Sequence, residues 1–521
     1  FFVFVLAEES YLWPTNASST VTALFAEERP HRYHAGIDIR TWGKIGYKLY
    51  ATSDGYISRI RTSSKGYGKA LYLKLSDGNT AVYAHLDKFT PSLENSAKNL
   101  QQYYNSYTID HVYDENQFPV RRGDLIGYTG DTGGISGAHL HFELRDKYEK
   151  PLNPLKFYSI DDNLPPIANQ LAIIPLNYKT KINGYPFRTI IDLKNKNHYE
   201  YYLPDTIAIE GKFGLALNVI DQIDGQPFHY GIYKITLKID DNINYSVTYD
   251  KLKFEDAKFI YTERNYSLKR ETGKQFYNLY SNHDNENLLF MENFNTSGLE
   301  FIDGGIHYIE IVVEDFYNNQ ISIKGIVINK LLNDTQFLYN KLNRVVSFKS
   351  DSLNHLRSVS FVKTGRYDED KQFPINLAMI GPSSFYLPDW EKPFTVLEIK
   401  PINKYGIKTP SIFLPTQDYD NISINGTTSI KHFKNSIAFQ FKEEFFTGLS
   451  PYVNLINNSF QRKYKLFRID KNLLSTNPIP FDELSNVNTF EVTYDEPFKY
   501  SFRKRFTNTI ARPKDDFYLS I

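Results

Sequence analysis

Two histidines near residue 140 are spaced so that both imidazole rings could act at one metal or catalytic site. Residues two apart in an extended strand point to the same face with Cα atoms about 6.6 Å apart. His139 and His141 would therefore lie side by side, while Leu140 and Phe142 face the other way. Two hydrogen-bonded surface histidines would explain this spacing equally well. The glycine-rich run at 130–137 favours a site, because it lets backbone approach closely.

His34 and Asp38 form a second candidate pair, on either side of Gly36. In a fully extended strand their Cα atoms would lie about 13 Å apart, near the limit at which both side chains reach one metal ion. A bend is therefore required, and glycine permits it. An exposed polar loop explains this short pattern at least as well when it is taken alone.

These residue types suit a zinc hydrolase. The chain has no cysteine, so a metal must be held by His, Asp or Glu. Catalytic zinc usually takes three protein ligands and one water. Two histidines and one aspartate would leave the site with a net charge near plus one, able to lower the pKa of that water towards about 7. A histidine beyond the ligands could hold or deprotonate the water.

Three segments in this order, His34–Asp38, Tyr83–His85 and His139–His141, resemble the M23 peptidases of the lysostaphin and LytM type, with their HxxxD, Tyr-x-His and HxH motifs. The resemblance implies that His34, Asp38 and His141 are the metal ligands of one Zn²⁺ per chain. It implies that His85 and His139 flank the zinc-bound water and the scissile carbonyl. The family's fold is two antiparallel sheets with a groove across one.

The resemblance covers roughly residues 30 to 150, and the sequence departs from it in places. The segment 90–119 is longer than the family's connection, so an extra wall or lid of the groove is expected. His31 is an additional histidine, expected at the surface or behind the ligands. Glu143 shares a strand face with His139 and His141 and could orient them, but a plain strand-end carboxylate is the simpler interpretation.

The surrounding sequence favours strands. The chain has 40 Tyr and 38 Phe against 2 Met, and aromatic residues favour sheets. Short alternating runs at 56–60, 70–75 and 80–85 predict a meander of antiparallel strands. Helical spacing of apolar residues after Pro91 predicts a short inserted helix, at Leu93, Ala97, Leu100 and Tyr104. The predicted fold class is mainly all-β: an M23-like antiparallel catalytic domain with a short helical insertion, followed by immunoglobulin-like β-sandwich modules.

A chain of 521 residues should contain three or four domains. The polar, proline-bearing stretch 161–166 is predicted to be a linker, and the catalytic unit before it is expected to fold by itself. Within the second unit, 307–316 and 320–328 predict a hairpin around Asn318 and Asn319. The predicted units are a signal-peptide remnant at 1–7, the peptidase domain at 8–160, a β-sandwich at 165–330, and β-rich domains at 331–418 and 419–521. The last of these looks truncated, because 517–521 resembles a strand cut short.

The composition of the chain argues against some classes of binding partner. The 60 basic and 60 acidic residues cancel, which argues against a nucleic-acid partner. No stretch approaches the roughly 20 apolar residues of a membrane span. The apolar run at 1–7 resembles the end of a signal peptide, so export to the periplasm, the cell envelope or the medium is expected, although a buried first strand is the alternative.

The predicted function is a secreted zinc metalloendopeptidase that hydrolyses peptide crosslinks of peptidoglycan by zinc-activated water. Two alternatives stay open at this point. One is a non-catalytic cell-wall-binding or hydrolase-activating protein with an M23-like domain. The other is a multidomain adhesion or scaffold protein, because more than two thirds of the chain carries no recognisable catalytic set.

Overall fold

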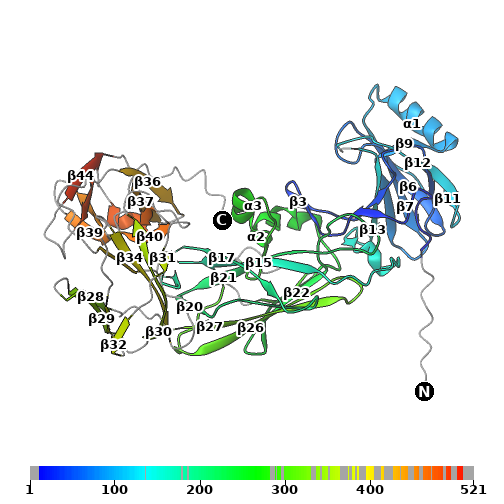
Figure 1. The fold of residues 1–521 in the computed structure, drawn as a ribbon. Coiled ribbons are helices and arrows are strands. Elements are labelled where there is room, and N and C mark those ends of the chain that lie inside the picture. Colours follow the sequence, from blue (N-terminus) through cyan, green and yellow to red (C-terminus); the bar gives the residue numbers. More distant parts are fainter. Residues whose placement is uncertain are drawn as a thin grey trace, which may run out of the picture.

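The computed structural model describes residues 11–134, 137–177, 180–184, 187–281, 288, 290–294 and 298–329, and then separate strands and short segments between 336 and 507. The predicted export signal at 1–7 lies outside the described residues. Strands dominate the described chain, which confirms the mainly all-β class (Figure 1). The described α-helices are short, and none of them has the length and apolar character of a membrane span.

The N-terminal unit contains two main antiparallel sheets and the two-stranded hairpin of β2 (Glu28–Arg29) and β3 (Arg32–Tyr33). The larger, nine-stranded sheet has the order β1-β4-β13-β8-β7-β6-β10, with β11 added beside β6 and β14 beside β13; the smaller has the order β5-β12-β9. The predicted meander is confirmed, because its runs lie on the successive strands β6, β7 and β8. The strands are β1 (Val21–Ala23), β4 (Ile37–Arg40), β5 (Lys48–Tyr50), β6 (Gly55–Thr62), β7 (Ala70–Leu75), β8 (Thr80–Ala84), β9 (Leu86–Phe89), β10 (Ile109–Val112), β11 (Pro119–Val120), β12 (Leu125–Thr129), β13 (His139–Arg145) and β14 (Pro151–Leu152).

The predicted inserted helix is α1 (Pro91–Tyr103). It begins at a proline, whose fixed backbone suits the first helical turn, and it buries Leu93 and Ala97. Further along the insertion, β10 extends the sheet beside β6 at the end opposite to β1 and β4. The structure therefore uses much of the long 90–119 segment to lengthen the sheet, and a wall or lid over the groove stays a prediction.

The alternation of β13 separates the core from the polar face of the sheet. Leu140, Phe142 and Leu144 are fully buried in the N-terminal core. Burying such side chains stabilises a fold by about 1.5–3 kcal/mol each, so they specify the register of the strand. A slip of one residue would turn His139 and His141 into the core.

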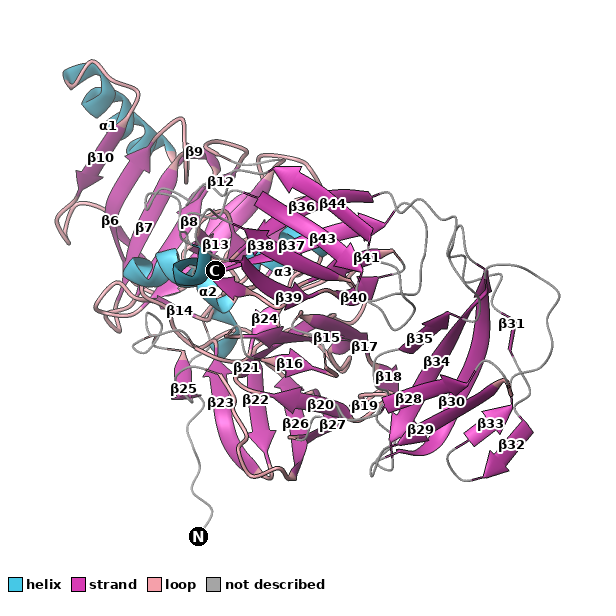
Figure 2. Cartoon of the chain, turned by 90° about the vertical axis from the view of Figure 1, so that its left-hand side faces the viewer, coloured by secondary structure: helices cyan, strands magenta, loops and turns pink. Residues whose placement is uncertain are grey.

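The second unit, 167–328, contains a four-stranded sheet, β17-β15-β21-β24, and a nine-stranded sheet whose main path is β16-β20-β27-β26-β22-β23-β25 (Figure 2). The predicted hairpin is confirmed as β26 and β27, with Asn318 in the left-handed region at φ 69°. Strands β19 and β20 pair in parallel with β27. The elements are β15 (Ile167–Pro175), β16 (Lys181–Ile182), β17 (Thr189–Asp192), β18 (Lys194–Asn195), β19 (Glu200–Tyr202), β20 (Ile207–Glu210), β21 (Phe213–Ile220), β22 (Lys234–Ile239), β23 (Asn242–Thr248), α2 (Ile260–Glu263), α3 (Tyr266–Thr272), β24 (Tyr277–Asn278), β25 (Met291–Phe294), β26 (Ile306–Glu314) and β27 (Gln320–Ile328).

The strands after residue 335 form four further sheets. Those from β28 (Gln336–Asn340) to β35 (Ile412–Pro415) make two sheets of four strands. Those from β36 (Gly426–His432) to β44 (Phe502–Thr507) make one sheet of five strands and one of four. Among the described strands, no sheet joins these two groups or connects either of them to the units before residue 330.

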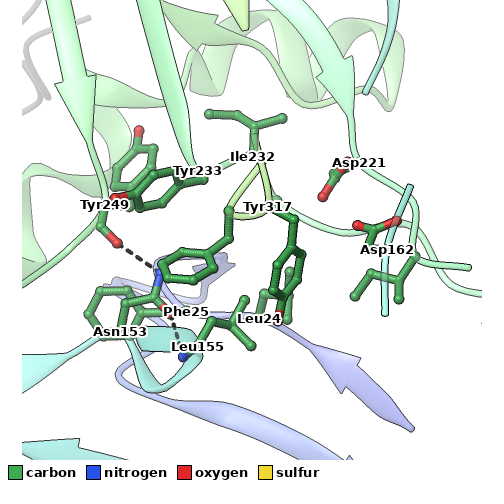
Figure 3. A pocket seen from close by; sticks show the side chains of 13 residues that line it. Leu24, Phe25, Asn153, Leu155, Asp162, Asp221, Ile232, Tyr233, Tyr249 and Tyr317 are labelled. Carbon is green, nitrogen blue, oxygen red and sulfur yellow. Dashed lines mark hydrogen bonds between the residues drawn. The ribbon is translucent and has the colours of Figure 1, made fainter. Parts of the chain in front are cut away.

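The first two units share their packing at the boundary between them. Phe25, which precedes the hairpin of β2 (Glu28–Arg29) and β3 (Arg32–Tyr33), and Tyr33 at the end of β3 belong to the core of the second unit. Tyr230 of the second unit lies in the core of the first. Figure 3 shows Phe25 among side chains of both units, where Asn153 donates a hydrogen bond to the carbonyl of Tyr249 at 3.1 Å.

Candidate metal and catalytic site

Strand register brings the candidate residues together. Asp38 on β4 lies directly opposite His141 on β13, and Ala84 of β8 lies opposite His141 on the other side. His85 is the first residue after β8. The chain bends at Gly36, where an added Cβ would lie 2.1 Å from a backbone oxygen of β13. Only glycine therefore lets this segment approach β13 closely enough to add His34.

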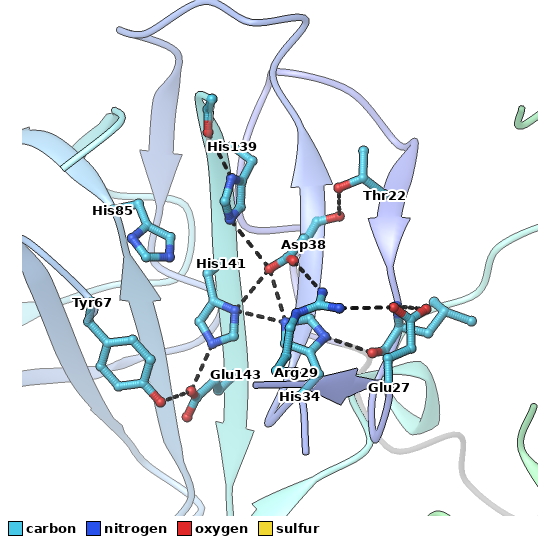
Figure 4. A network of polar contacts seen from close by, with 12 residues as sticks. Thr22, Glu27, Arg29, His34, Asp38, Tyr67, His85, His139, His141 and Glu143 are labelled. Carbon is cyan, nitrogen blue, oxygen red and sulfur yellow. Dashed lines mark hydrogen bonds and ion pairs between the residues drawn. The ribbon is translucent and has the colours of Figure 1, made fainter. Parts of the chain in front are cut away.

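Three buried side chains converge on one point (Figure 4). His34 Nε2 lies 3.0 Å from both Asp38 Oδ1 and His141 Nδ1, and the last two atoms are 2.9 Å apart. Three ligands of a tetrahedral zinc ion at 2.0–2.1 Å would be separated by roughly 3.3 Å. The triangle of donor atoms therefore fits one zinc ion after a relaxation of a few tenths of an ångström.

The outer hydrogen bonds of the two histidines orient their lone pairs into this triangle. His34 Nδ1 lies 2.7 Å from the carbonyl oxygen of Leu24, and His141 Nε2 lies 2.8 Å from Glu143 Oε1. A carbonyl or carboxylate oxygen only accepts, so each of these ring nitrogens carries the proton. In the neutral rings, His34 Nε2 and His141 Nδ1 then face Asp38 as acceptors. Three acceptors in mutual contact need a cation between them.

The pKa shifts of Asp38 and His141 also show that this cluster favours a positive charge. Burial raises the pKa of Asp38, but His34 and His141 outweigh it and hold that pKa well below its usual value. Burial lowers the pKa of His141, whereas its hydrogen bonds to Asp38 and Glu143 raise it, to about 9. The cluster of acceptors thus favours a positive charge among them, which a proton on His141 or a metal ion can supply.

Glu143 is the main support of His141, and the simpler interpretation of it as a strand-end carboxylate is wrong. It is fully buried, and its Oε2 accepts from Arg145 Nε at 2.8 Å and Nη2 at 2.6 Å. The hydroxyl of Tyr67 donates to Oε1, and the Tyr67 ring stacks on His141 with centroids 5.4 Å apart. Burial raises the pKa of Glu143, but Arg145 and His141 lower it to about 2. Glu143 therefore stays ionised.

Arg29 supports the other side of the cluster. Its Nη2 lies 2.9 Å from Asp38 Oδ2, the carboxylate oxygen that does not face the histidines, and its Nη1 lies 3.3 Å from Glu27. Sequence reasoning missed Arg29 and Tyr67, and no short motif marks either residue. Both reach the site through sheet and hairpin geometry.

His85 and His139 lie together beside the cluster, with ring centroids 4.9 Å apart. His85 Nδ1 lies 2.9 Å from the Thr132 carbonyl, and His139 Nδ1 lies 3.1 Å from the Gly137 carbonyl. In the neutral rings these contacts leave both Nε2 atoms unprotonated, and Nε2 of His139 lies 3.6 Å from Asp38 Oδ1 (Figure 4). Burial, with the nearby His141 and His139, lowers the pKa of His85 to about 3, and burial lowers the pKa of His139. Both rings are therefore neutral proton acceptors at neutral pH.

The backbone of His85 is itself unusual. Its φ of 64° lies in the left-handed region, which costs a non-glycine residue of this kind about 1–2 kcal/mol. Such strain persists only where the surroundings enforce it, and it clusters at functional sites. Here the His85 N–H donates to the carbonyl of Tyr67 at 2.9 Å, which turns the chain out of β8 and directs the ring towards His139.

The other candidates have structural roles. His31 is exposed, as predicted, and its ring packs edge-on against Tyr261 of the second unit. Tyr83 is fully buried in the N-terminal core, where its hydroxyl donates to the carbonyl of Tyr50. The structure therefore brings His34, Asp38, His85, His139 and His141 into one site and leaves His31 outside it.

No family model matches the chain, but known proteins are similar to part of it. The DD-carboxypeptidase/endopeptidase Mpg of Neisseria meningitidis serogroup B is 31% identical over 124 residues, which cover 24% of this chain and 22% of that protein. The chain thus spans about a fifth of the length of this relative.

Solved structures are also similar to the chain, over about a quarter of its length. A zinc-containing peptidase from Vibrio cholerae is 25% identical with a TM-score of 0.22, and the similarity covers 28% of this chain and 40% of that one. The catalytic domain of the M23 protein EnpA from Enterococcus faecalis is 21% identical with a TM-score of 0.19, and covers 26% and 88%. The resemblance predicted from the sequence is confirmed over about a quarter of the chain.

Proposed function

We propose that this chain, whose N-terminal unit is of the M23 peptidase type, is an exported zinc metalloendopeptidase that hydrolyses peptide crosslinks of peptidoglycan in the periplasm or cell envelope. The observation that carries the proposal is the triangle of acceptor atoms on His34, Asp38 and His141, whose histidine tautomers are set from outside. The relative named as a DD-carboxypeptidase/endopeptidase supports a peptide substrate.

His34, Asp38 and His141 would hold the zinc ion. When bound, zinc lowers the pKa of a water molecule and polarises a carbonyl oxygen. The residues around the ligands keep the site ready for this ion: Leu24 and Glu143 fix the two rings, and Arg29 binds the outer oxygen of Asp38. Such outer partners typically change metal affinity about 10–100-fold.

His85 and His139 would act as general base and general acid. Each ring presents an unprotonated Nε2, because its Nδ1–H is donated to a backbone carbonyl. A neutral imidazole in this position can accept a proton from the attacking water and return it to the leaving amine. The His139 side chain is 19% exposed against 7% for His141, so substrate would approach from the His139 side.

The alternatives predict different behaviour. A non-catalytic wall-binding or hydrolase-activating protein, or an adhesion or scaffold protein, does not need neutral, unprotonated His85 and His139 next to a complete ligand set. The deciding experiment incubates the purified chain with soluble crosslinked muropeptides and follows the products by mass spectrometry. Cleavage should stop after chelation and return with added zinc.

A His139→Ala protein, prepared identically, controls for contaminating hydrolases. If the wild-type chain holds one zinc ion and cleaves neither muropeptides nor intact walls, the enzymatic proposal is wrong. Binding to walls without cleavage would then support the first alternative.

A further inference from the structure

A second group of carboxylates lies away from the histidines, at the junction of the first two units. Asp162 belongs to the linker, Asp221 follows β21, and Asp315 follows β26. One oxygen from each lies within 4.8 Å of one oxygen from both others. Figure 3 shows Asp162 and Asp221 close together at the edge of the pocket that also contains Leu24 and Tyr317.

Two carboxylate oxygens of this group accept no hydrogen bond from the residues that the structure describes. Asp221 is 2% exposed, and its Oδ1 makes no hydrogen bond within the part of the chain that the structure describes. Asp162 Oδ2 likewise accepts no hydrogen bond from the described residues, and its carboxyl group lies close enough to Asp315 to share a proton with it. Leaving a buried charged oxygen unsatisfied costs more than the 1–3 kcal/mol of a neutral group. An arrangement of this kind requires an explanation such as an ion.

The local charges increase the cost. Burial raises the pKa of Asp221 well above its usual value, and the charges that raise it further are Asp315, Asp162 and Glu27. Burial also raises the pKa of Asp162, to about 6, and the pKa of Asp315. The charges of Asp162 and Asp315 thus disfavour ionised Asp221, while a hydrogen bond between Asp162 and Asp315 raises the pKa of the first and lowers that of the second. A cation between the three carboxyl groups would replace the shared proton and relieve the repulsion at Asp221.

The backbone nevertheless holds the carboxylates in place. Asp315 Oδ1 accepts the N–H groups of Tyr317 and Asn319 at 2.8 Å, and its Oδ2 accepts from Asn319 Nδ2 at 2.7 Å. Asp162 Oδ1 accepts the N–H of Leu164 at 3.1 Å. Asn319 Nδ2 also donates to the Asp162 carbonyl at 3.1 Å. The hairpin turn and the linker thus preorganise their carboxylates.

We propose that Asp162, Asp221 and Asp315 form a Ca²⁺ site that fastens the linker to the second unit. Ca²⁺ takes six to eight oxygen ligands, including several carboxylates, in a flexible geometry. Mg²⁺ usually keeps several waters and binds one or two carboxylates, so three carboxylates from three separate segments favour calcium. Backbone carbonyls or water would complete the shell.

This site would also hold the N-terminal unit in place. The backbones of Asp221 and Tyr230 exchange hydrogen bonds at 2.9 Å, and the Tyr230 hydroxyl donates to the carbonyl of Val21 on β1 at 2.8 Å. Strand β1 pairs with β4, which carries Asp38. A calcium ion at Asp221 would therefore order a short chain of contacts that ends at the sheet of the zinc cluster.

The test measures binding of CaCl₂ to the full chain with zinc bound, by isothermal titration calorimetry and by equilibrium dialysis with radioactive calcium. The wild-type chain should bind about one Ca²⁺. Asp221→Asn and Asp162→Asn should each weaken binding at least about a hundredfold, since each removes a charged ligand. Asp161→Asn, the same change at the exposed neighbour in the linker, should bind calcium as the wild type does.

Thermal unfolding provides a second readout that a folding defect would not reproduce. In calcium-free buffer Asp221→Asn should melt at or above the wild-type temperature, because it relieves repulsion. In millimolar CaCl₂ the wild-type Tm should rise by several degrees and the variant should not respond. The proposal is wrong if the wild-type chain binds no calcium, if Asp221→Asn and Asp162→Asn bind it equally well, or if MgCl₂ alone gives the effect.

Discussion

His141 and Glu143 lie two residues apart on one face of β13, and the Nε2–H of His141 is donated to Glu143 Oε1 over 2.8 Å. This bond selects the His141 tautomer whose Nδ1 faces Asp38 and His34. Arg145, two residues further along the same face, holds the other oxygen of Glu143. Three alternate residues of one strand thus form a row in which each member orients the one before it.

Glu143→Gln should therefore weaken zinc binding without removing a ligand. The amide still offers an oxygen to His141, but the charge that favours the His141 tautomer and pairs with Arg145 is lost. We expect affinity to fall about 10–100-fold, measured by competition with a chromogenic chelator. Glu149→Gln, at an exposed residue that also contacts Arg145, is the matched control. Equal affinity of Glu143→Gln and wild type would show that the row is not needed for the metal.

The proposed ligands should behave as one group. His34→Ala, Asp38→Ala and His141→Ala each remove one corner of the triangle, so each protein should lose zinc and activity together. The measurement is zinc per chain by elemental analysis after dialysis against trace zinc, alongside the rate of crosslink cleavage. Stoichiometric zinc in any of the three would remove that residue from the ligand set.

His139→Ala and His85→Ala should keep near-stoichiometric zinc and the fold while losing turnover. Proton-transfer or oxyanion partners contribute about a hundredfold to a thousandfold or more, roughly 3–4 kcal/mol of barrier. The same zinc and rate measurements decide this. If His139→Ala loses its zinc while His141→Ala retains it, the assignment within the pair is reversed; if all five variants stay active, the site is elsewhere.

Truncation after residue 160 should impair the metal site, contrary to the independent folding expected from the sequence. Phe25 and Tyr33 would lose the core of the second unit, and the carbonyl of Ala26 would lose Arg264, which donates to it at 3.2 Å. This segment carries Leu24 and Arg29, which support His34 and Asp38. We expect an aggregating fragment or one with reduced zinc content, compared by light scattering and elemental analysis with the full chain. A soluble fragment that has full zinc content and activity would contradict this.

The carboxylate site predicts a pH dependence of stability in calcium-free buffer. The folded pKa of Asp162, about 6, is above its unfolded value of about 3.9, so its contribution is present below pH 4 and is lost as pH rises through 6. Relative to the uncharged Asp162→Asn, the wild-type chain should be equally stable near pH 4 and roughly 1 kcal/mol less stable at pH 7, after allowance for solvent screening. Urea unfolding of both proteins at the two pH values measures this. A difference in unfolding free energy that does not change with pH would show that burial and the neighbouring carboxyl groups do not raise the pKa of Asp162.

The sequence by itself determined the features that depend on local periodicity. Alternation along 139–145 showed which face of the strand carries His139 and His141, and helical spacing after Pro91 indicated α1. The order of the three short motifs also indicated the set of five site residues. The strand face and the helix were predicted correctly because the direction of a side chain within one strand or helix follows from its own few neighbours. The five site residues came instead from the family resemblance, and their roles stay a prediction.

Only the tertiary structure decided which of those faces meet. The pairing of β4 with β13 placed Asp38 opposite His141, and the turn after β8 added His85. Tyr67 and Arg29 reach the cluster from segments without a motif, and Asp162, Asp221 and Asp315 come together from three distant parts of the chain. The order and register of strands depend on burial summed over whole sheets. Contacts between distant strands therefore cannot be predicted from any short segment of the sequence.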